Sequence, residues 1–134
     1  MKKLIFLDID NVIIIDNKPI DKNIIDELNK LNAEIVICSS WGDLGKNFLE
    51  SLGITLPIIG STKHFYNTLI CRGCEVKNWI DTNINENEDY DYALVDDCED
   101  YLIEQEKYLV HVNYKTGLTI EDVNKIKTIL SERM

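Results

Sequence analysis

The sequence lacks any long apolar run, and this limits where the protein can act. The apolar run at residues 4–7 is ended by Asp8 and Asp10, and four residues are too few for the hydrophobic region of a secretory signal. No other stretch approaches the roughly 20 apolar residues of a membrane-spanning helix. We therefore expect a cytoplasmic protein with no membrane partner.

Basic residues are scarce, with 14 Lys and Arg against 24 Asp and Glu and a formal net charge of -10. Residues 78–106 hold eleven acidic side chains and no Lys or Arg, so the rest of the chain is close to neutral. Within that region, the polar run at residues 81–91 is typical of a solvated loop. An acidic chain is poorly suited to tight, nonspecific nucleic-acid binding, which depends on many Lys and Arg contacts to phosphate.

Clustered Cys and His ligands are also missing. Cys71 and Cys74 have the CxxC spacing of zinc and redox sites, but no second CxxC or HxxxH pair follows them. Without a secretion signal, the cysteines are interpreted as buried or partly buried free thiols. His64 and His111 stand alone and are interpreted as packed side chains. A redox or metal role of Cys71 and Cys74 stays open.

Proline and glycine are few, with two and six residues, and no linker or repeat divides the 134 residues. We expect one domain over residues 1–134. Strand patterns occur at residues 4–8, 34–39, 92–95 and 108–112, helix patterns at 21–32, 42–53, 74–80 and 119–130, and a hairpin pattern at 12–20. This alternation predicts an α/β fold, with a Rossmann-like parallel sheet covered by helices on both faces.

Short local signals mark the ends of several elements. Asp16 and Asn17 suit the turn of the hairpin. Asp21 is a plausible N-cap of the first helix. Thr119 followed three residues later by Asp122 predicts a capped start of the last helix.

Polar residues follow three of the predicted strands at the point where each strand ends. These residues are Asp8 and Asp10, Ser39 and Ser40, and Asp96 and Asp97. Ligands of open parallel sheets bind outside the carboxyl ends of the strands. Carboxylates that face one another need a cation, and oxygen ligands without clustered His or Cys favour Mg²⁺. Because an Asp can attack phosphorus and a second Asp can transfer protons, the pattern predicts phosphoryl chemistry.

Four segments resemble the motifs of the haloacid dehalogenase-like (HAD) phosphohydrolases. LIFLDIDNV (4–12) is similar to the first motif, IVICSS (35–40) to the second, and YALVDDCED (92–100) to the fourth. RGCEVKNWI (72–80) is similar to the helix that begins with the third-motif cation. The segments SSW, RGCEV, LVDDCED and VHVNYKTGLT further resemble a group of HAD domains associated with RNA repair and phage-type genomes.

The resemblance implies catalytic roles for the first two motifs. Asp8 would be the nucleophile and a Mg²⁺ ligand. Asp10 would be the general acid and base, and its backbone carbonyl would be a further metal ligand. Ser39 would bind the phosphoryl group, in preference to Ser40. Asn11 stands where the family most often has Gly, and Asn tolerates a positive φ better than other non-glycine residues do.

The resemblance also implies roles for the later motifs. Arg72 would be the phosphate-binding cation, with Lys77 and then Lys63 as competitors. Asp97 would be the direct metal ligand of the acidic pair, and Asp96 would support it.

The intervals between the motifs leave no room for a separate cap domain. The resemblance therefore implies a capless, Mg²⁺-dependent phosphatase that acts through an aspartyl-phosphate. Its substrate would be a nucleotide, a nucleic-acid end or another phosphomonoester. A catalytically idle HAD-fold binding module is the alternative. A receiver-type signalling domain is less favoured, because its acidic residues follow the strands in a different order.

Overall fold

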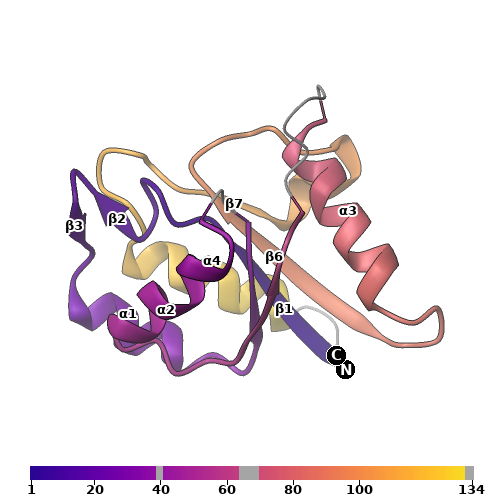
Figure 1. Cartoon of the computed structure of the whole chain (residues 1–134), viewed down its shortest axis with the longest axis horizontal. Coiled ribbons are helices and arrows are strands. Elements are labelled where there is room, and N and C mark those ends of the chain that lie inside the picture. Colours follow the sequence, from indigo (N-terminus) through magenta and orange to yellow (C-terminus); the bar gives the residue numbers. More distant parts are fainter. Residues whose placement is uncertain (39–40, 64–69, 132–134) are drawn as a thin grey trace.

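The centre of the computed structural model, which describes residues 1–38, 41–63 and 70–131, is a five-stranded sheet (Figure 1). Its strands, in spatial order, are β5 (Ile58–Ser61), β4 (Glu34–Ile37), β1 (Lys2–Leu7), β6 (Tyr90–Asp96) and β7 (Leu109–His111). All four pairings are parallel, and Phe6 of β1 lies opposite Val36 on one side and Leu94 on the other. The predicted α/β fold is confirmed.

Helices cover both faces of the sheet, because the strands are apolar on both faces. One face is covered by α1 (Lys22–Asn29), α2 (Asp43–Ser51) and α4 (Ile120–Ser131), and the other by α3 (Arg72–Asn83) and the 3₁₀ helix η1 (Ile103–Tyr108) (Figure 1). Successive residues of β1 alternate between the two cores: Ile5 and Leu7 face the first, and Leu4 and Phe6 the second. Trp79 of α3 packs edge-on against Phe6, with ring centroids 5.7 Å apart.

A small antiparallel hairpin follows β1, as predicted. It consists of β2 (Ile14–Ile15) and β3 (Lys18–Pro19), and both turn residues, Asp16 and Asn17, have positive φ values of 48° and 63°. Asn and Asp are the non-glycine residues that best tolerate this conformation. Between β1 and α3, the described residues form this hairpin, helices α1 and α2 and strands β4 and β5, without a separate cap domain.

The predicted helix caps are confirmed in position. The Thr119 hydroxyl accepts from the Asp122 N–H at 3.2 Å, and the Asp122 carboxylate accepts from the Thr119 N–H at 3.0 Å. Asp21 occupies the N-cap of α1, but its side chain makes no capping hydrogen bond. None of the helices in the described parts of the chain has the length and apolar character needed to cross a bilayer.

The prediction of a solvated loop at residues 81–91 is wrong at both ends. Helix α3 extends to Asn83, and β6 begins at Tyr90. The Asp91 side chain is buried, and its carboxylate accepts a hydrogen bond from the backbone N–H of Tyr92 at 2.9 Å. Strand β5 and helix η1 were not predicted, and α3 begins two residues earlier than its sequence pattern indicated.

Candidate active site

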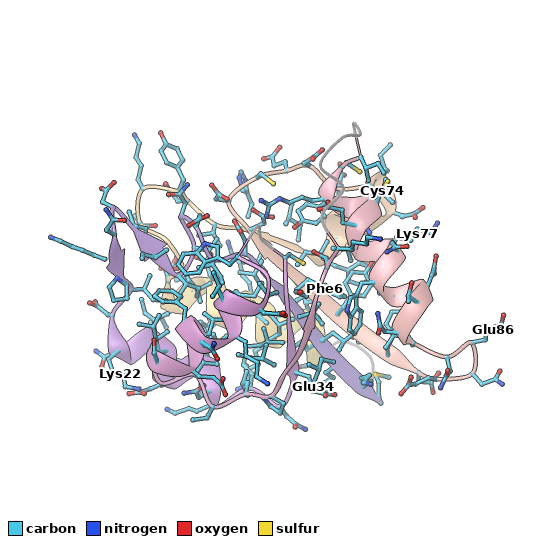
Figure 2. The ribbon with its side chains drawn as sticks, viewed as in Figure 1. Phe6, Lys22, Glu34, Cys74, Lys77 and Glu86 are labelled. Atoms are coloured by element: carbon cyan, nitrogen blue, oxygen red, sulfur yellow. The ribbon has the colours of Figure 1, made fainter. Side chains whose placement is uncertain are left out.

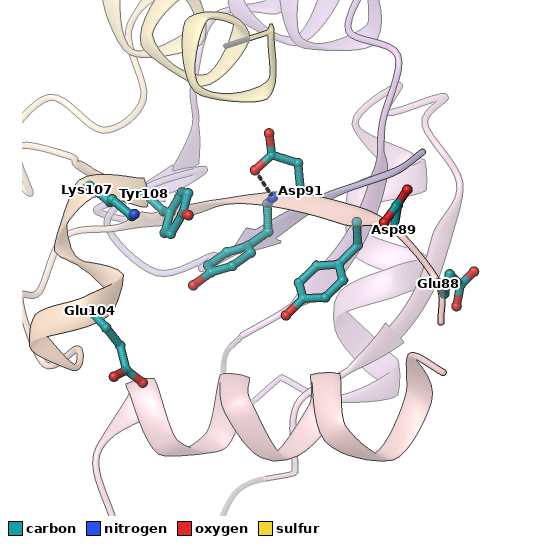
Figure 3. A pocket seen from close by; sticks show the side chains of 8 residues that line it. Glu88, Asp89, Asp91, Glu104, Lys107 and Tyr108 are labelled. Atoms are coloured by element: carbon teal, nitrogen blue, oxygen red, sulfur yellow. Dashed lines mark hydrogen bonds between the residues drawn. The ribbon is translucent and has the colours of Figure 1, made fainter. Parts of the chain in front are cut away.

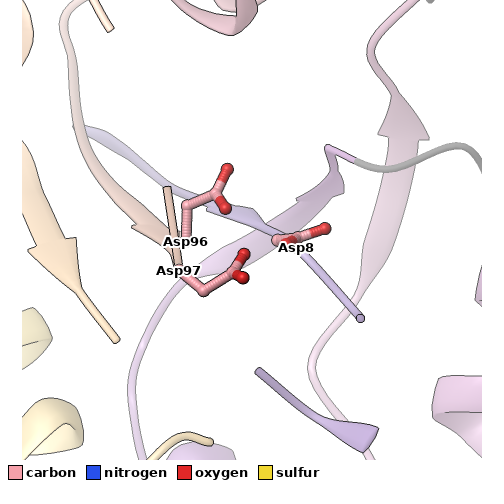
Figure 4. Close-up of side chains that lie close together, drawn as sticks. All are labelled: Asp8, Asp96 and Asp97. Atoms are coloured by element: carbon pink, nitrogen blue, oxygen red, sulfur yellow. The ribbon is translucent and has the colours of Figure 1, made fainter. Parts of the chain in front are cut away.

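Three carboxylates meet at the carboxyl edge of the sheet, and we call Asp8, Asp96 and Asp97 the aspartate cluster (Figure 4). Asp8 follows β1, and Asp96 ends the neighbouring strand β6, in register because Leu7 lies opposite Val95. One carboxylate oxygen from each member lies within 4.8 Å of the other two. The predicted convergence of strand-end carboxylates is therefore observed. Both Asp8 and Asp96 are buried, with 3% and 0% exposure.

Arg72 brings a positive charge to the aspartate cluster from the first position of α3. Its Nη1 lies 2.9 Å from Asp96 Oδ2 and 3.2 Å from Asp8 Oδ1. The same nitrogen donates to the backbone carbonyl of Cys38 at 2.8 Å. Lys77 is exposed further along α3 (Figure 2), and Lys63 is exposed after β5. Of these three predicted candidates, the structure thus brings Arg72 against the aspartates.

Asp96 is held in its charged form by several donors. Tyr101 Oη donates to Asp96 Oδ2 at 2.7 Å, and the Cys98 N–H donates to Oδ1 at 3.1 Å. Burial raises the pKa of Asp96, but the Arg72 charge and these hydrogen bonds outweigh it, so the pKa is lowered overall. Both Asp96 oxygens are thus engaged by donors from the protein, and its predicted supporting role at the metal stays a prediction.

Asp97 is more accessible than Asp96 and is positioned by two residues from other segments. The Asn11 amide donates to Asp97 Oδ2 at 3.4 Å, and His111 Nε2 lies 3.0 Å from the Asp97 carbonyl oxygen. Asn11 has a φ of 64°, a conformation that Asn tolerates better than other non-glycine residues do. His111 is exposed and lies 3.0 Å from Glu99, so its prediction as a packed side chain is wrong.

The Asp8 carboxyl is in an unfavourable position for a free anion. Burial and the neighbouring Asp96 charge raise its pKa to about 8, more than Arg72 lowers it. A cation among the carboxylates would relieve this repulsion. The donors of the aspartate cluster are all oxygens, which is the donor set of a hard ion such as Mg²⁺. The residues present thus fit a divalent cation, with Asp8 and Asp97 best placed to hold it.

Asp10 lies outside the aspartate cluster, exposed at the start of the hairpin. The indole Nε1 of Trp41 donates to Asp10 Oδ1 at 3.1 Å, and the Trp41 ring packs on Phe48 of α2 at 4.7 Å. No local pattern in the sequence predicts this contact, because the two residues lie 31 positions apart. The hydrogen bond from Tyr101 to Asp96, only five positions apart, also has no motif that predicts it.

Three residues named in the sequence predictions cannot be placed. Ser39 and Ser40 lie outside the described residues, as does His64. The phosphate-binding role of Ser39 therefore stays a prediction, and so does the metal-binding role of the Asp10 carbonyl.

A cavity of about 340 Å³ opens at the opposite end of β6 (Figure 3). It is lined by three tyrosines, Tyr90, Tyr92 and Tyr108, together with Glu88, Asp89, Asp91, Glu104 and Lys107. Its rim is predominantly acidic and would repel a phosphate group. The cavity is thus unsuited to the chemistry of the aspartate cluster.

The fold and the strand-end motifs define a HAD-like domain, the class of many phosphohydrolases. Residues 4–123 match the family described as "HAD domain in Swiss Army Knife RNA repair proteins". Since the match spans most of the 134 residues, the chain belongs to this family. The chain has no significant match among curated proteins or among solved structures.

Proposed function

We propose that the chain is a Mg²⁺-dependent phosphatase that forms an aspartyl-phosphate on Asp8. One observation carries the proposal: a buried carboxylate with a raised pKa lies 3.2 Å from a guanidinium and within reach of two further carboxylates. Family membership supports phosphohydrolase chemistry in general. An interaction module would not require this arrangement, because a buried group of like charges is costly.

Asp8 and Arg72 have complementary roles in this proposal. An ionised Asp8 oxygen attacks phosphorus, and the phosphoryl group is transferred to it from the leaving oxygen. Arg72 binds a phosphoryl oxygen and stabilises the charge spread over the transferred group. Its contacts with Asp96 and the Cys38 carbonyl fix the guanidinium, so little reorganisation is needed during the reaction. Ser39 is proposed as a second ligand of the phosphoryl oxygens.

Asp10 is proposed as the general acid and base. It protonates the leaving oxygen, and it then removes a proton from the water that hydrolyses the aspartyl-phosphate. Its exposure suits a group that exchanges protons with solvent. The Trp41 N–H, which donates to one carboxylate oxygen, orients Asp10 and leaves the other oxygen for proton transfer.

Mg²⁺ would be held by Asp8, Asp97 and the Asp10 carbonyl, with Asp96 in support. When bound, it supplies positive charge that neutralises phosphoryl oxygens and permits Asp8 to ionise at neutral pH.

A nucleic-acid end or a nucleotide is the proposed substrate class. The described residues contain no cap domain that would enclose a small substrate, and the family description refers to RNA repair proteins. A cavity of about 220 Å³ between α2 and β5 is lined partly by Lys46 and Ser61, which are donors for a second phosphate, and also by Asp43, whose carboxylate would oppose one. The acidic surface elsewhere favours brief contact with an end over tight binding along a strand.

The test is phosphate release by wild type, Asp8→Asn and Asp10→Asn, with Mg²⁺ or a chelator. An aryl phosphate is assayed first, and then nucleotides and oligonucleotides with 3′- or 5′-phosphates. We expect metal-dependent release that is lost in both variants. Release that survives Asp8→Asn would refute the mechanism. No release from any substrate by the folded wild type would favour the idle binding module.

A further inference from the structure

Two cysteines flank Arg72 at the start of α3. Cys71 is the N-cap, Cys74 lies in the first turn, and their sulfur atoms are 3.4 Å apart. Both thiols are free; Cys71 is partly buried, and Cys74 is exposed near the N-terminal end of the helix (Figure 2). The expectation of free thiols is met, whereas the expectation of burial is wrong for Cys74. A disulfide bond is about 2 Å long, so the two sulfur atoms need to move only slightly more than 1 Å closer to form one.

The described residues around this pair do not resemble a zinc site. Structural zinc requires four ligands from Cys, His or carboxylates. Within the described ranges, the aspartate cluster is the one group of three or more such ligands, and it contains no cysteine. Two cysteines at the N-cap and in the first turn of a helix are instead the arrangement of reversible dithiol–disulfide sites.

We propose that Cys71 and Cys74 form a redox-active dithiol whose disulfide holds Arg72 at the aspartate cluster. The oxidant is a low-molecular-weight disulfide such as glutathione disulfide. The Cys71 thiolate, whose sulfur accepts the Cys74 N–H at 3.4 Å, attacks one of its sulfurs, which forms a mixed disulfide and releases one thiolate. The Cys74 thiolate then attacks the Cys71 sulfur and releases the second. Two protein thiols lose two electrons and two protons, and the small disulfide is reduced to two thiols.

The backbone between the two cysteines is already fixed in the position that Arg72 needs. The Arg72 N–H donates to Asp100 Oδ2 at 3.3 Å, and the Gly73 N–H donates to the Asp100 carbonyl at 3.0 Å. A Cβ added at Gly73 would lie 2.7 Å from the Leu102 backbone nitrogen, so this turn packs tightly on the segment before η1. Because the sulfurs are close while the Arg72 side chain reaches Asp8 and Asp96, closure of the disulfide favours this arrangement.

Disulfide formation is tested on the whole chain with glutathione buffers of increasing disulfide fraction, followed by intact-mass measurement and peptide mapping. Cys71→Ser removes one sulfur while it keeps a preferred N-cap residue, so the helix start is preserved. Cys98→Ser is the matched control for pairing with another partly buried thiol. We expect loss of two hydrogens in wild type and Cys98→Ser, reversed by dithiothreitol, and none in Cys71→Ser. A native wild type that stays reduced, or a Cys71→Ser variant that still forms an internal disulfide, would overturn the dithiol.

The effect on the helix start is tested by thermal unfolding of the oxidised and reduced forms. A closed loop of this size raises the Tm by a few degrees when the native geometry accommodates it. An oxidised form that melts below the reduced form would overturn the claim that the disulfide favours the observed position of Arg72.

A third test compares phosphate release by the oxidised and reduced forms, and it rests on the proposed function. Oxidised protein should release phosphate at least as fast as reduced protein, and a tenfold loss confined to the oxidised form would again contradict the fixing of Arg72. If neither form releases phosphate, the proposed function fails, while the mass and unfolding results still decide the dithiol.

Discussion

Replacement of Asp8 by Asn should stabilise the metal-free protein at neutral pH while it abolishes activity. The buried Asp8 carboxyl has a pKa of about 8, against 3.8 for an unperturbed Asp, because burial and Asp96 disfavour its charge. Between these two pH values the folded state retains a proton that the unfolded state has lost. The stability contributed by protonated Asp8 is therefore complete below pH 4 and is lost as the pH rises to about 8.

The size of the effect follows from this difference in proton binding. One proton corresponds to a slope of up to about 1.4 kcal/mol per pH unit. The wild type should thus lose roughly 1–3 kcal/mol relative to Asp8→Asn between pH 5 and pH 7. Asp96, whose pKa is lowered, is ionised in both states over this range and adds no slope. Arg72 keeps its 2.9 Å contact with Asp96 in the variant, so no buried charge is left without a partner.

The assay is thermal unfolding in a chelator at several pH values, compared with saturating Mg²⁺. The difference in Tm between Asp8→Asn and wild type should grow by at least roughly 4 °C from pH 5 to pH 7. Mg²⁺ should stabilise the wild type at neutral pH and leave Asp8→Asn almost unchanged. Parallel pH profiles for the two proteins, or equal stabilisation by Mg²⁺, would refute the reasoning.

Three further substitutions separate the contributions of neighbouring residues. Trp41→Phe removes the N–H that orients Asp10 but keeps an aromatic ring. We therefore expect kcat to fall several-fold, with a Tm change of only a few degrees. An unchanged kcat would contradict the orienting role. Tyr101→Phe removes a 2.7 Å hydrogen bond to ionised Asp96 and should cost about 1–3 kcal/mol in denaturant unfolding, more than Tyr108→Phe, the same change in the remote cavity. Gly73→Ala places a Cβ against the backbone of residues 101–102 and should cost about 1–3 kcal/mol, and a neutral result would show that this turn is loosely packed.

The parts of the fold that could be predicted are those with strong local patterns. Buried parallel strands are continuous apolar runs, so β1 and β4 were found within one or two residues. Strand β5 is a short edge strand that contains Gly60, and η1 is a single 3₁₀ segment. Neither has a periodicity that distinguishes it from a loop.

In the candidate site, too, the features that could be predicted are those with a local sequence pattern. The strand-end carboxylates could be predicted, because parallel strands carry their ends to one edge of the sheet. The resemblance favoured Arg72 over Lys77, and the structure places Arg72 at the first position of α3, directly after the Cys71 N-cap. The Trp41 contact with Asp10 depends on tertiary packing and has no local sequence signal.

The most direct test of the central claim is a search for the phosphorylated intermediate in Asp10→Asn. An aryl phosphate has a good leaving group that needs little protonation, so this variant should still phosphorylate Asp8 but hydrolyse the product slowly. Acid-quenched samples should carry one phosphoryl group on the peptide that contains residue 8, and Asp8→Asn should carry none. An active wild type whose Asp10→Asn variant never acquires this adduct, or an adduct on another residue, would contradict Asp8 as the nucleophile.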